Sequence, residues 1–198
     1  MAIYLKKFET QAAYEAAQSG LILPNVSLIV ETNGVAYNPY VPSFFCKLIL
    51  NNGETVELEG SGELTSTMIS PYISTCVSVE IGKLCTSIGG SAFQSCKSLT
   101  SIDIPNSVTI IGSGAFLSCS GLISCTIGNG VTSIGVEAFY WCSSLTSATV
   151  NATTPPTLSG GAFDSTNNCP IYVPSGSVEA YKSATNWSTY ASRIQAIP

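Results

Sequence analysis

The sequence predicts an α/β repeat protein: a β-rich solenoid of about five rungs of 23 residues, preceded by an α/β segment and followed by a helical one. The first observation is a repeat, because SIGGSAFQSC, IIGSGAFLSC and SIGVEAFYWC begin 23 residues apart at Ser87, Ile110 and Ser133. The second is alternation of apolar and polar residues after each of these segments, which is typical of a strand with one buried face. A unit this short cannot bury its apolar face alone, so copies must stack around one continuous core.

The strand of each rung is predicted from two apolar columns that recur at the same period. They are Ile81, Ile104, Ile127, Val150 and Val173, and, two residues earlier, Val79, Ile102, Cys125, Ala148 and Ile171. A phenylalanine marks the turn of each unit, and in the fourth copy the turn slips by one residue to Phe163. We therefore expect Phe93, Phe116, Phe139 and Phe163 to stack as an interior ladder.

Residues 87–108 read SIGGSAFQSCKSLTSIDIPNSV. This segment resembles the unit of the BspA-like leucine-rich repeats of bacterial surface proteins, roughly SIG-x-x-AF-x-x-C-x-x-L-x-S-I-x-IP-x-S-V. The resemblance covers about residues 76–178, departs from the motif at 124–128 and is degenerate in the fourth copy. It implies a leucine-rich-repeat-like solenoid that is exposed at a surface and binds a partner. It names no ligand, because a fold alone does not fix a function.

Three segments follow from this pattern. We expect residues 1–60 to form an N-terminal α/β capping module, residues 61–177 the repeat solenoid, and residues 178–198 a C-terminal helical cap. The first segment predicts a strand at 3–8, a helix at 10–18, and hairpins around Asn33 and Gly34 and around Asn52 and Gly53. The last segment spaces Trp187, Tyr190 and Ile194 so that they can seal the final rung, since the ends of a solenoid must be covered.

The opening MAIYLKKF lacks the apolar segment of a secretory signal. No apolar run approaches the roughly 18 residues of a membrane-spanning helix, so we expect no membrane insertion. The repeat resemblance implies a cell-surface or extracellular location. The segments YLKKFET, LPNVS and YNP also resemble the start of tail-associated or prophage-encoded proteins of gut anaerobes, which would place the protein on a virion. Synthesis in the cytoplasm without Sec export also stays open.

The charge pattern argues against several functions. A net charge of −5 with only 10% charged residues does not fit a nucleic-acid partner, which needs clustered Lys or Arg. The chain has no histidine, so no Ser-His or Cys-His pair can be built. It also has no C-x-x-C pair, which together with the absence of histidine argues against a zinc site, and we expect no metal or cofactor. Glu57, Glu59 and Glu63 could supply a glycosidase pair, although strand carboxylates are usually the solvated half of the alternation. We expect no enzyme, with a carbohydrate-active enzyme as the alternative from another class.

Six of the eight cysteines occupy apolar positions of the repeat. Cys96, Cys119 and Cys142 share one column, in which stacked side chains point in parallel and not toward each other. Neighbouring strands lie about 4.8 Å apart, so the distance permits a bridge while the direction disfavours one. The pattern therefore predicts reduced, buried thiols in place of a disulfide framework.

Two polar columns lie between the inward strand positions and should face outward from the sheet. These candidate ligand-binding residues are Ser78, Glu80, Ser101, Asp103, Ser124, Thr126, Ser147, Thr149 and Tyr172. Solenoids bind partners on their sheet faces, and short hydroxyls suit hydrogen bonding to glycans or peptide backbone. The alternative is that Ser and Thr are only the solvated side of a strand.

A second candidate surface lies on the turn after each phenylalanine. Gln94 and Ser95 of the first copy are replaced by Leu117 and Ser118 in the second, and by Tyr140 and Trp141 in the third. Because aromatic residues are favoured binding anchors, Leu117, Tyr140 and Trp141 are a candidate partner anchor. The alternative is that the fourth repeat or the C-terminal segment folds over them.

These observations predict a non-enzymatic adhesion or interaction module, displayed on a bacterial cell surface or a virion. Its partner would be a protein or a glycan on a host or neighbouring cell. The alternative is a structural assembly subunit or spacer of a phage tail or surface structure. Either function is compatible with a homo-oligomer.

Overall fold

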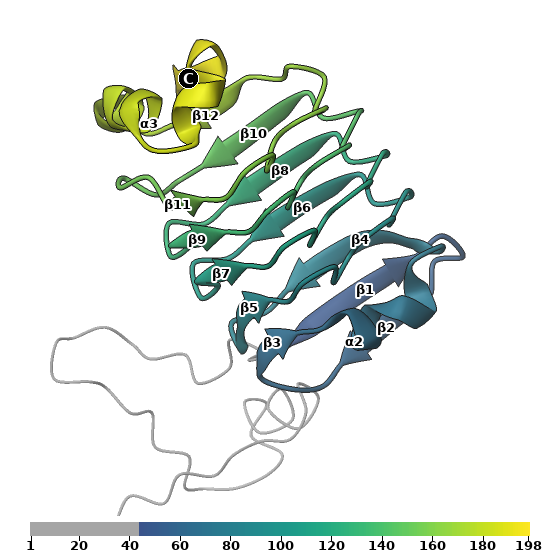
Figure 1. Ribbon diagram of the computed structural model, residues 1–198. Helices are drawn as coiled ribbons and strands as arrows, with labels where there is room; N and C mark the ends of the chain where they lie inside the picture. The colour runs from purple at the N-terminus through teal and green to yellow at the C-terminus, as the bar shows by residue number, and fades with distance from the viewer. Residues whose placement is uncertain (1–43) are drawn as a thin grey trace, which may run out of the picture. The chain divides into compact units, whose positions relative to one another are not determined.

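The computed structural model describes residues 44–198, which form two sheets built from stacked repeats (Figure 1). The strand at 3–8, the helix at 10–18 and the hairpin around Asn33 and Gly34 lie outside the described residues. The division of the chain at residues 60 and 177 stays a prediction. None of the helices within residues 44–198 is long and apolar enough to cross a membrane.

The larger sheet has eight strands in the order β13-β12-β10-β8-β6-β4-β1-β2. Six of them are parallel neighbours: β4 (Cys76–Ile81), β6 (Ser101–Ile104), β8 (Ser124–Ile127), β10 (Ser147–Val150), β12 (Ile171–Val173) and β13 (Ile194–Ala196). Ser101 pairs with Ser124 and Ser124 pairs with Ser147, so the register between strands equals the repeat of the sequence. This equality stacks each residue on its counterpart in the next unit.

The first two strands, β1 (Cys46–Leu50) and β2 (Thr55–Leu58), form an antiparallel hairpin that pairs with β4 through β1. This is the hairpin predicted around Asn52 and Gly53. Gly53 has a φ of +82°, which a glycine adopts without steric cost. The hairpin therefore continues the sheet of the repeats.

The smaller sheet is parallel throughout, in the order β11-β9-β7-β5-β3. Its strands are β3 (Gly62–Leu64), β5 (Cys85–Ile88), β7 (Ile110–Ile111), β9 (Ser133–Ile134) and β11 (Thr157–Leu158). Leu158 pairs with Ile134, 24 positions earlier, which confirms the predicted one-residue slip in the fourth copy. Short helices complete the structure: α2 (Ser66–Ile69), η1 (Ser70–Tyr72), η2 (Ser175–Ser177), α3 (Val178–Ser183) and η3 (Trp187–Arg193).

The predicted phenylalanine ladder forms the centre of the core. Phe93, Phe116, Phe139 and Phe163 are fully buried. Successive rings have centroids 5.1 to 5.2 Å apart and planes within 7° of parallel, a spacing typical of attractive aromatic pairs. The sequence columns therefore predict the interior packing correctly.

The cysteines pack beside this ladder. All eight are buried and none forms a disulfide, which confirms the prediction of free thiols. The thiol of Cys119 donates a hydrogen bond to the carbonyl of Phe93 at 3.0 Å, and that of Cys142 donates to Phe116 at 3.2 Å. This column therefore links each turn to the one before it, in addition to filling space.

The C-terminal segment supplies hydrogen-bonding groups that a further repeat would otherwise provide. The N–H groups of Phe93 and Phe116 donate to the alanine carbonyls of the next copy at 2.7 and 2.8 Å. Phe163 has no following copy, and its N–H donates to the hydroxyl of Tyr190 at 3.2 Å. In the same way, the side-chain amide of Asn186 donates to the carbonyl of Leu158 at 2.6 Å. Side chains of η3 and its flank thus take over backbone hydrogen bonds of the stack.

Tyr181, Trp187, Tyr190 and Ile194 are all buried, as their spacing predicts. Trp187 packs on Phe163 with ring centroids 5.9 Å apart, and its indole N–H donates to the carbonyl of Pro156 at 2.8 Å. The segment is not wholly helical, because β13 adds a strand to the larger sheet. That strand is a feature that helical spacing does not predict.

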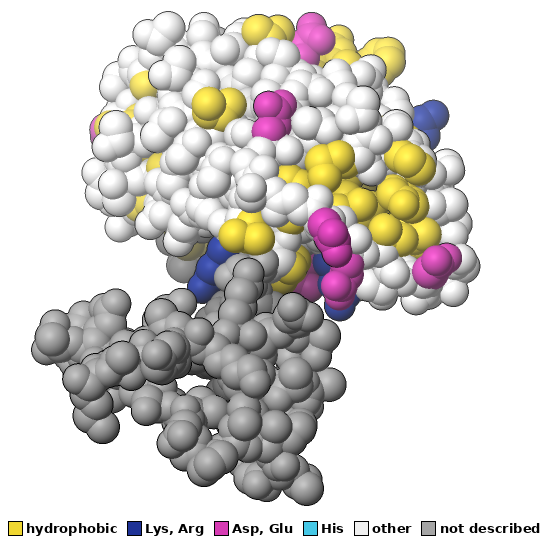
Figure 2. All heavy atoms as spheres, turned by 90° about the horizontal axis from the view of Figure 1, so that it is seen from below, with side chains coloured by type: hydrophobic (Ala, Val, Ile, Leu, Met, Phe, Trp, Pro, Cys, Tyr) yellow, Lys and Arg dark blue, Asp and Glu magenta, His cyan; other side chains and the backbone are white. Residues whose placement is uncertain are grey.

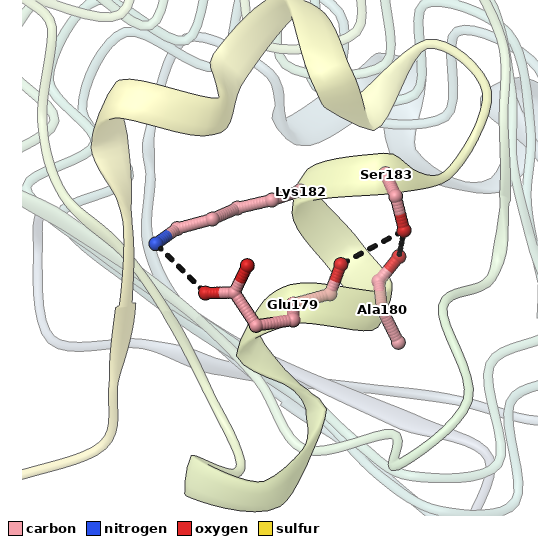
Figure 3. A network of polar contacts seen from close by, with 4 residues as sticks. All are labelled: Glu179, Ala180, Lys182 and Ser183. Carbon is pink, nitrogen blue, oxygen red and sulfur yellow. Dashed lines mark hydrogen bonds and ion pairs between the residues drawn. The ribbon is translucent and has the colours of Figure 1, made fainter.

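On the outer side of α3, Lys182 and Glu179 form an ion pair of 3.2 Å, and the hydroxyl of Ser183 donates to the carbonyls of Glu179 and Ala180 (Figure 3). The ion pair is the only one within residues 44–198. Because the Glu179 side chain is 87% exposed, the pair contributes little to stability.

The end of the stack that holds β2, β3 and α2 lies opposite the C-terminal segment (Figure 1). Seen from below, hydrophobic side chains gather there beside acidic ones (Figure 2). Val56, Leu58, Met68 and Tyr72 come from β2, α2 and η1, and pack on the core while remaining partly exposed.

Candidate functional site

The outer face of the larger sheet carries the predicted polar columns in register. Glu80 pairs with Asp103, and Asp103 pairs with Thr126. Thr149 then pairs with both Thr126 and Tyr172. The structure thus brings five of the predicted residues, from five strands, into one line.

Strand pairing extends this line at both ends. One end is the hairpin of β1 and β2, and the other is Gln195, which lies one 23-residue period after Tyr172, where the predicted columns end. Lys47 of β1 pairs with both Glu57 and Glu80, and Gln195 of β13 pairs with Tyr172. The first row, as we call it, has one residue from each of the eight strands. It consists of Glu57, Lys47, Glu80, Asp103, Thr126, Thr149, Tyr172 and Gln195.

A second row runs beside the first on the same face. Its predicted members are Ser78, Ser101, Ser124 and Ser147, and Ile49 and Thr55 extend it across the hairpin. Within residues 44–198, no hydroxyl of either row is engaged in a side-chain hydrogen bond. Their donors and acceptors are therefore available to a ligand or to water.

Charge is distributed unevenly along the first row. Glu57, Glu80 and Asp103 lie toward the β2 end, with Lys47 between the two glutamates. From Thr126 to Gln195 the row has no charged residue. One end of the face is therefore acidic and the other neutral.

The three carboxylates considered for catalysis are divided between the two sheets. Glu57 lies in β2 of the larger sheet and faces the position of Lys47, Glu59 follows that strand, and Glu63 lies in β3 of the smaller sheet. The part of the chain that the structure describes has no group of three or more His, Cys, Asp or Glu residues that could hold a metal ion.

The predicted aromatic anchor lies on the turn side of the repeats. The indole of Trp141 is 58% exposed, and its ring lies 5.8 Å from that of Tyr140 at an angle of 20°. Tyr140 and Leu117 are half-buried. The C-terminal aromatics Trp187 and Tyr190 pack on Phe163 and leave the Trp141 indole at the surface.

A groove of about 450 Å³ runs beside Trp141. It is lined by two repeat columns, Ser95, Ser118 and Trp141 in one and Lys97, Ser120 and Ser143 in the other. Of these residues, sequence reasoning identified only Trp141 as a binding residue. The missed signal was periodicity itself, because each column has one member per unit and all members must lie on the same side of the stack.

Comparison with known families connects these repeats to an established type. The family model of the BspA type leucine rich repeat region matches residues 72–190 in six copies, whereas the strand columns predict five rungs. A search of curated proteins found no match. Repeats of this family are typically surface-associated, generally non-enzymatic modules of protein interaction. Because its strands pair at the repeat period and the family model matches more than half of its length, the chain belongs to the BspA-type leucine-rich repeat family.

Proposed function

We propose that this chain is a non-enzymatic binding module, exposed on a bacterial cell or a virion, that holds a protein ligand on the outer face of its larger sheet. The observation that carries the proposal is the first row, in which eight consecutive strands each contribute one outward residue in register. Solenoids use extended faces of this kind for partner binding.

The dimensions of the row suit an extended segment of a partner. Eight strands about 4.8 Å apart give a row about 34 Å long. An extended peptide rises about 3.3 Å per residue, so about ten residues would span the face. The unengaged hydroxyls of Thr126 and Thr149 can bond to the backbone of such a segment.

The uneven charge of the first row favours a ligand whose two ends differ in charge. Glu80 and Asp103 are exposed neighbours at the acidic end. Opposite charges across an interface steer encounter and fix orientation. We therefore expect a partner segment with Lys or Arg at one end and small polar residues at the other.

The fold proposal that accompanies this function is a solenoid of about five rungs whose C-terminal end is capped by residues 178–198. The hydrogen bonds from Phe163 to Tyr190 and from Asn186 to Leu158 support the cap. The second of these bonds lies at β11, the edge strand of the smaller sheet, where an open edge would invite pairing with another chain.

The test is a selection of extended peptides, displayed on phage, against the immobilised full chain, followed by calorimetry of the selected peptides. We expect peptides with a basic end, bound about tenfold or more weakly by Asp103→Asn and by Thr126→Arg, since losing a central contact commonly has such an effect. Ser113→Arg, which adds the same charge at an exposed position outside both sheets, is the matched control and should bind normally.

Equal binding by Thr126→Arg and the wild type would overturn the proposal, as would a selection that yields no peptide. Sedimentation of the same variants tests the assembly alternative. A wild-type oligomer that Thr126→Arg converts to monomer would make this face a contact between copies of the chain.

A further inference from the structure

The backbone at Trp141 has a conformation that does not favour tryptophan. Its φ is +59°, and the residues at the same position in the earlier copies, Ser95 and Ser118, have φ values of +63° and +59°. Glycine and asparagine tolerate this left-handed region best, and a bulky residue there is an outlier. The small serines suit the turn, so the exposed indole in the third copy is not explained by folding.

Strained residues of this kind are concentrated at binding and catalytic sites. The inward residues of the turn do not need the indole, since Ala138, Phe139 and Cys142 are fully buried without it. What Trp141 adds is a flat aromatic face on the outside of the repeats, next to the ring of Tyr140.

The groove beside this aromatic face is lined with hydroxyl groups. Ser95, Ser118, Ser120 and Ser143 contribute them, and none forms a side-chain hydrogen bond with another residue of the described range 44–198. Lys97 is the only charged residue in the lining. The groove therefore offers one stacking surface, several neutral donors and acceptors, the ammonium donor of Lys97, and no carboxylate.

The floor of the groove is held by a regular series of backbone hydrogen bonds. The N–H of Ser95 donates to the carbonyl of Leu117 at 2.8 Å, and that of Ser118 donates to Tyr140 at 2.8 Å. The N–H of Trp141 donates to the carbonyl of Asp164 at 3.2 Å. These bonds fix the backbone from which the side chains project, so binding need not order the backbone of the groove.

We infer that this groove is a second binding site, separate from the sheet face, and that it takes a neutral oligosaccharide. A sugar ring has an apolar C–H face that packs on an aromatic ring, and a rim of hydroxyls that both donate and accept hydrogen bonds. Trp141 provides the first contact and the serine columns the second. A ligand that made only one of these contacts would not account for the aromatic face and the serine columns lying together.

The length of the groove favours an oligosaccharide over a single sugar. From the first copy to the third, two repeat spacings of about 4.8 Å separate the level of Ser95 from that of Trp141 by about 10 Å. A ring stacked on Trp141 would thus leave the serines of the first copy unused. Further rings of the same chain would reach them.

The two tryptophans of the chain make a direct test possible. Trp187 is fully buried and Trp141 is 58% exposed, so quenching of tryptophan fluorescence by acrylamide reports on Trp141. An array of neutral and acidic oligosaccharides is first probed with the full chain. We expect neutral oligosaccharides to bind, and the strongest of them, titrated into the protein, to protect Trp141 from acrylamide.

Variants then locate the site. Trp141→Asn introduces a residue that suits the left-handed backbone but has no aromatic ring. It should bind the selected oligosaccharide at least about tenfold more weakly. Trp141→Phe, which retains a ring, should bind with intermediate affinity. Tyr140→Gln with Trp141→Ser, the residues of the first copy, should abolish binding while leaving the melting temperature at the wild-type value.

The control is Ser124→Ala on the sheet face, which should bind the oligosaccharide as the wild type does. The inference is overturned if no neutral oligosaccharide binds, or if Trp141→Asn leaves the affinity for the oligosaccharide unchanged. It is also overturned if the Trp141 variants bind the oligosaccharide normally but no longer bind the peptides selected against the full chain. The last result would make Trp141 part of a protein interface. Because sheet-face variants test the proposed function independently, either proposal can fail without the other.

Discussion

The hydroxyl of Tyr190 accepts a hydrogen bond from the backbone N–H of Phe163 at 3.2 Å and donates one to the carboxylate of Asp164 at 2.8 Å. A side-chain oxygen therefore takes the place that an alanine carbonyl has in each earlier repeat. Burial raises the pKa of Tyr190 to about 12, so the hydroxyl keeps the proton that it donates to Asp164 at neutral pH.

Tyr190→Phe should lower the free energy of unfolding by about 1 to 3 kcal/mol, because it leaves the buried N–H of Phe163 without an acceptor. Urea unfolding followed by circular dichroism measures the change. Tyr172→Phe removes the same atom from the outward face and should change stability by no more than about 0.5 kcal/mol. Equal effects of the two variants would show that the Phe163 hydrogen bond contributes nothing specific.

Phe116→Ala should lower the free energy of unfolding by about 3 to 5 kcal/mol, because the ring is fully buried between Phe93 and Phe139 and its loss leaves a cavity. Ile110→Ala is the matched control, since Ile110 is 49% exposed and should lose little. Chemical denaturation of both variants makes the comparison. A loss below about 1 kcal/mol for Phe116→Ala would contradict the interior ladder.

Thiol titration of unfolded, unreduced protein should find close to eight free groups, while native protein should react slowly. The reason is that all eight thiols are buried, and reagents attack the exposed thiolate form. The titration uses protein protected from air oxidation. Four or fewer free thiols would instead indicate a disulfide framework.

The stability of the protein should fall as the pH rises above 9. Burial raises the pKa of Cys46, Cys96 and Cys142 from 9.0 to about 12, and that of Cys76 to about 11. Between pH 9 and about 11 the folded chain therefore keeps protons that the unfolded chain releases. Each such thiol lowers the free energy of unfolding by up to about 1.4 kcal/mol per pH unit in this window.

Urea unfolding at pH 8, 9, 10 and 10.5 measures this dependence. Below about pH 8 the thiols contribute almost no slope, because there both states hold nearly all of their protons. Replacing Cys96 and Cys142 with Ala should make the decline shallower at high pH, since two of the shifted groups are removed. A stability that is constant from pH 8 to 10.5 would show that the buried thiols do not titrate differently in the two states.

The repeat architecture was readable from the sequence because each unit meets its neighbour through residues at equal spacing. Phe93, Phe116 and Phe139 had to stack once the strands paired in register, and the outward positions of Asp103 and Thr126 followed from simple alternation. In a periodic stack, residues at equal spacing along the sequence are also neighbours in three dimensions.

What the tertiary structure alone decided lies where periodicity ends. Lys47 joins the first row through an antiparallel hairpin strand outside the repeat columns, and this pairing leaves no periodic signal. Tyr190 replaces a carbonyl through a hydrogen bond whose partner is 27 positions away. The sequence by itself therefore determined the stack and its outward columns, while the ends of the stack and the exposure of Trp141 depended on where side chains of non-repeating segments come to lie in three dimensions.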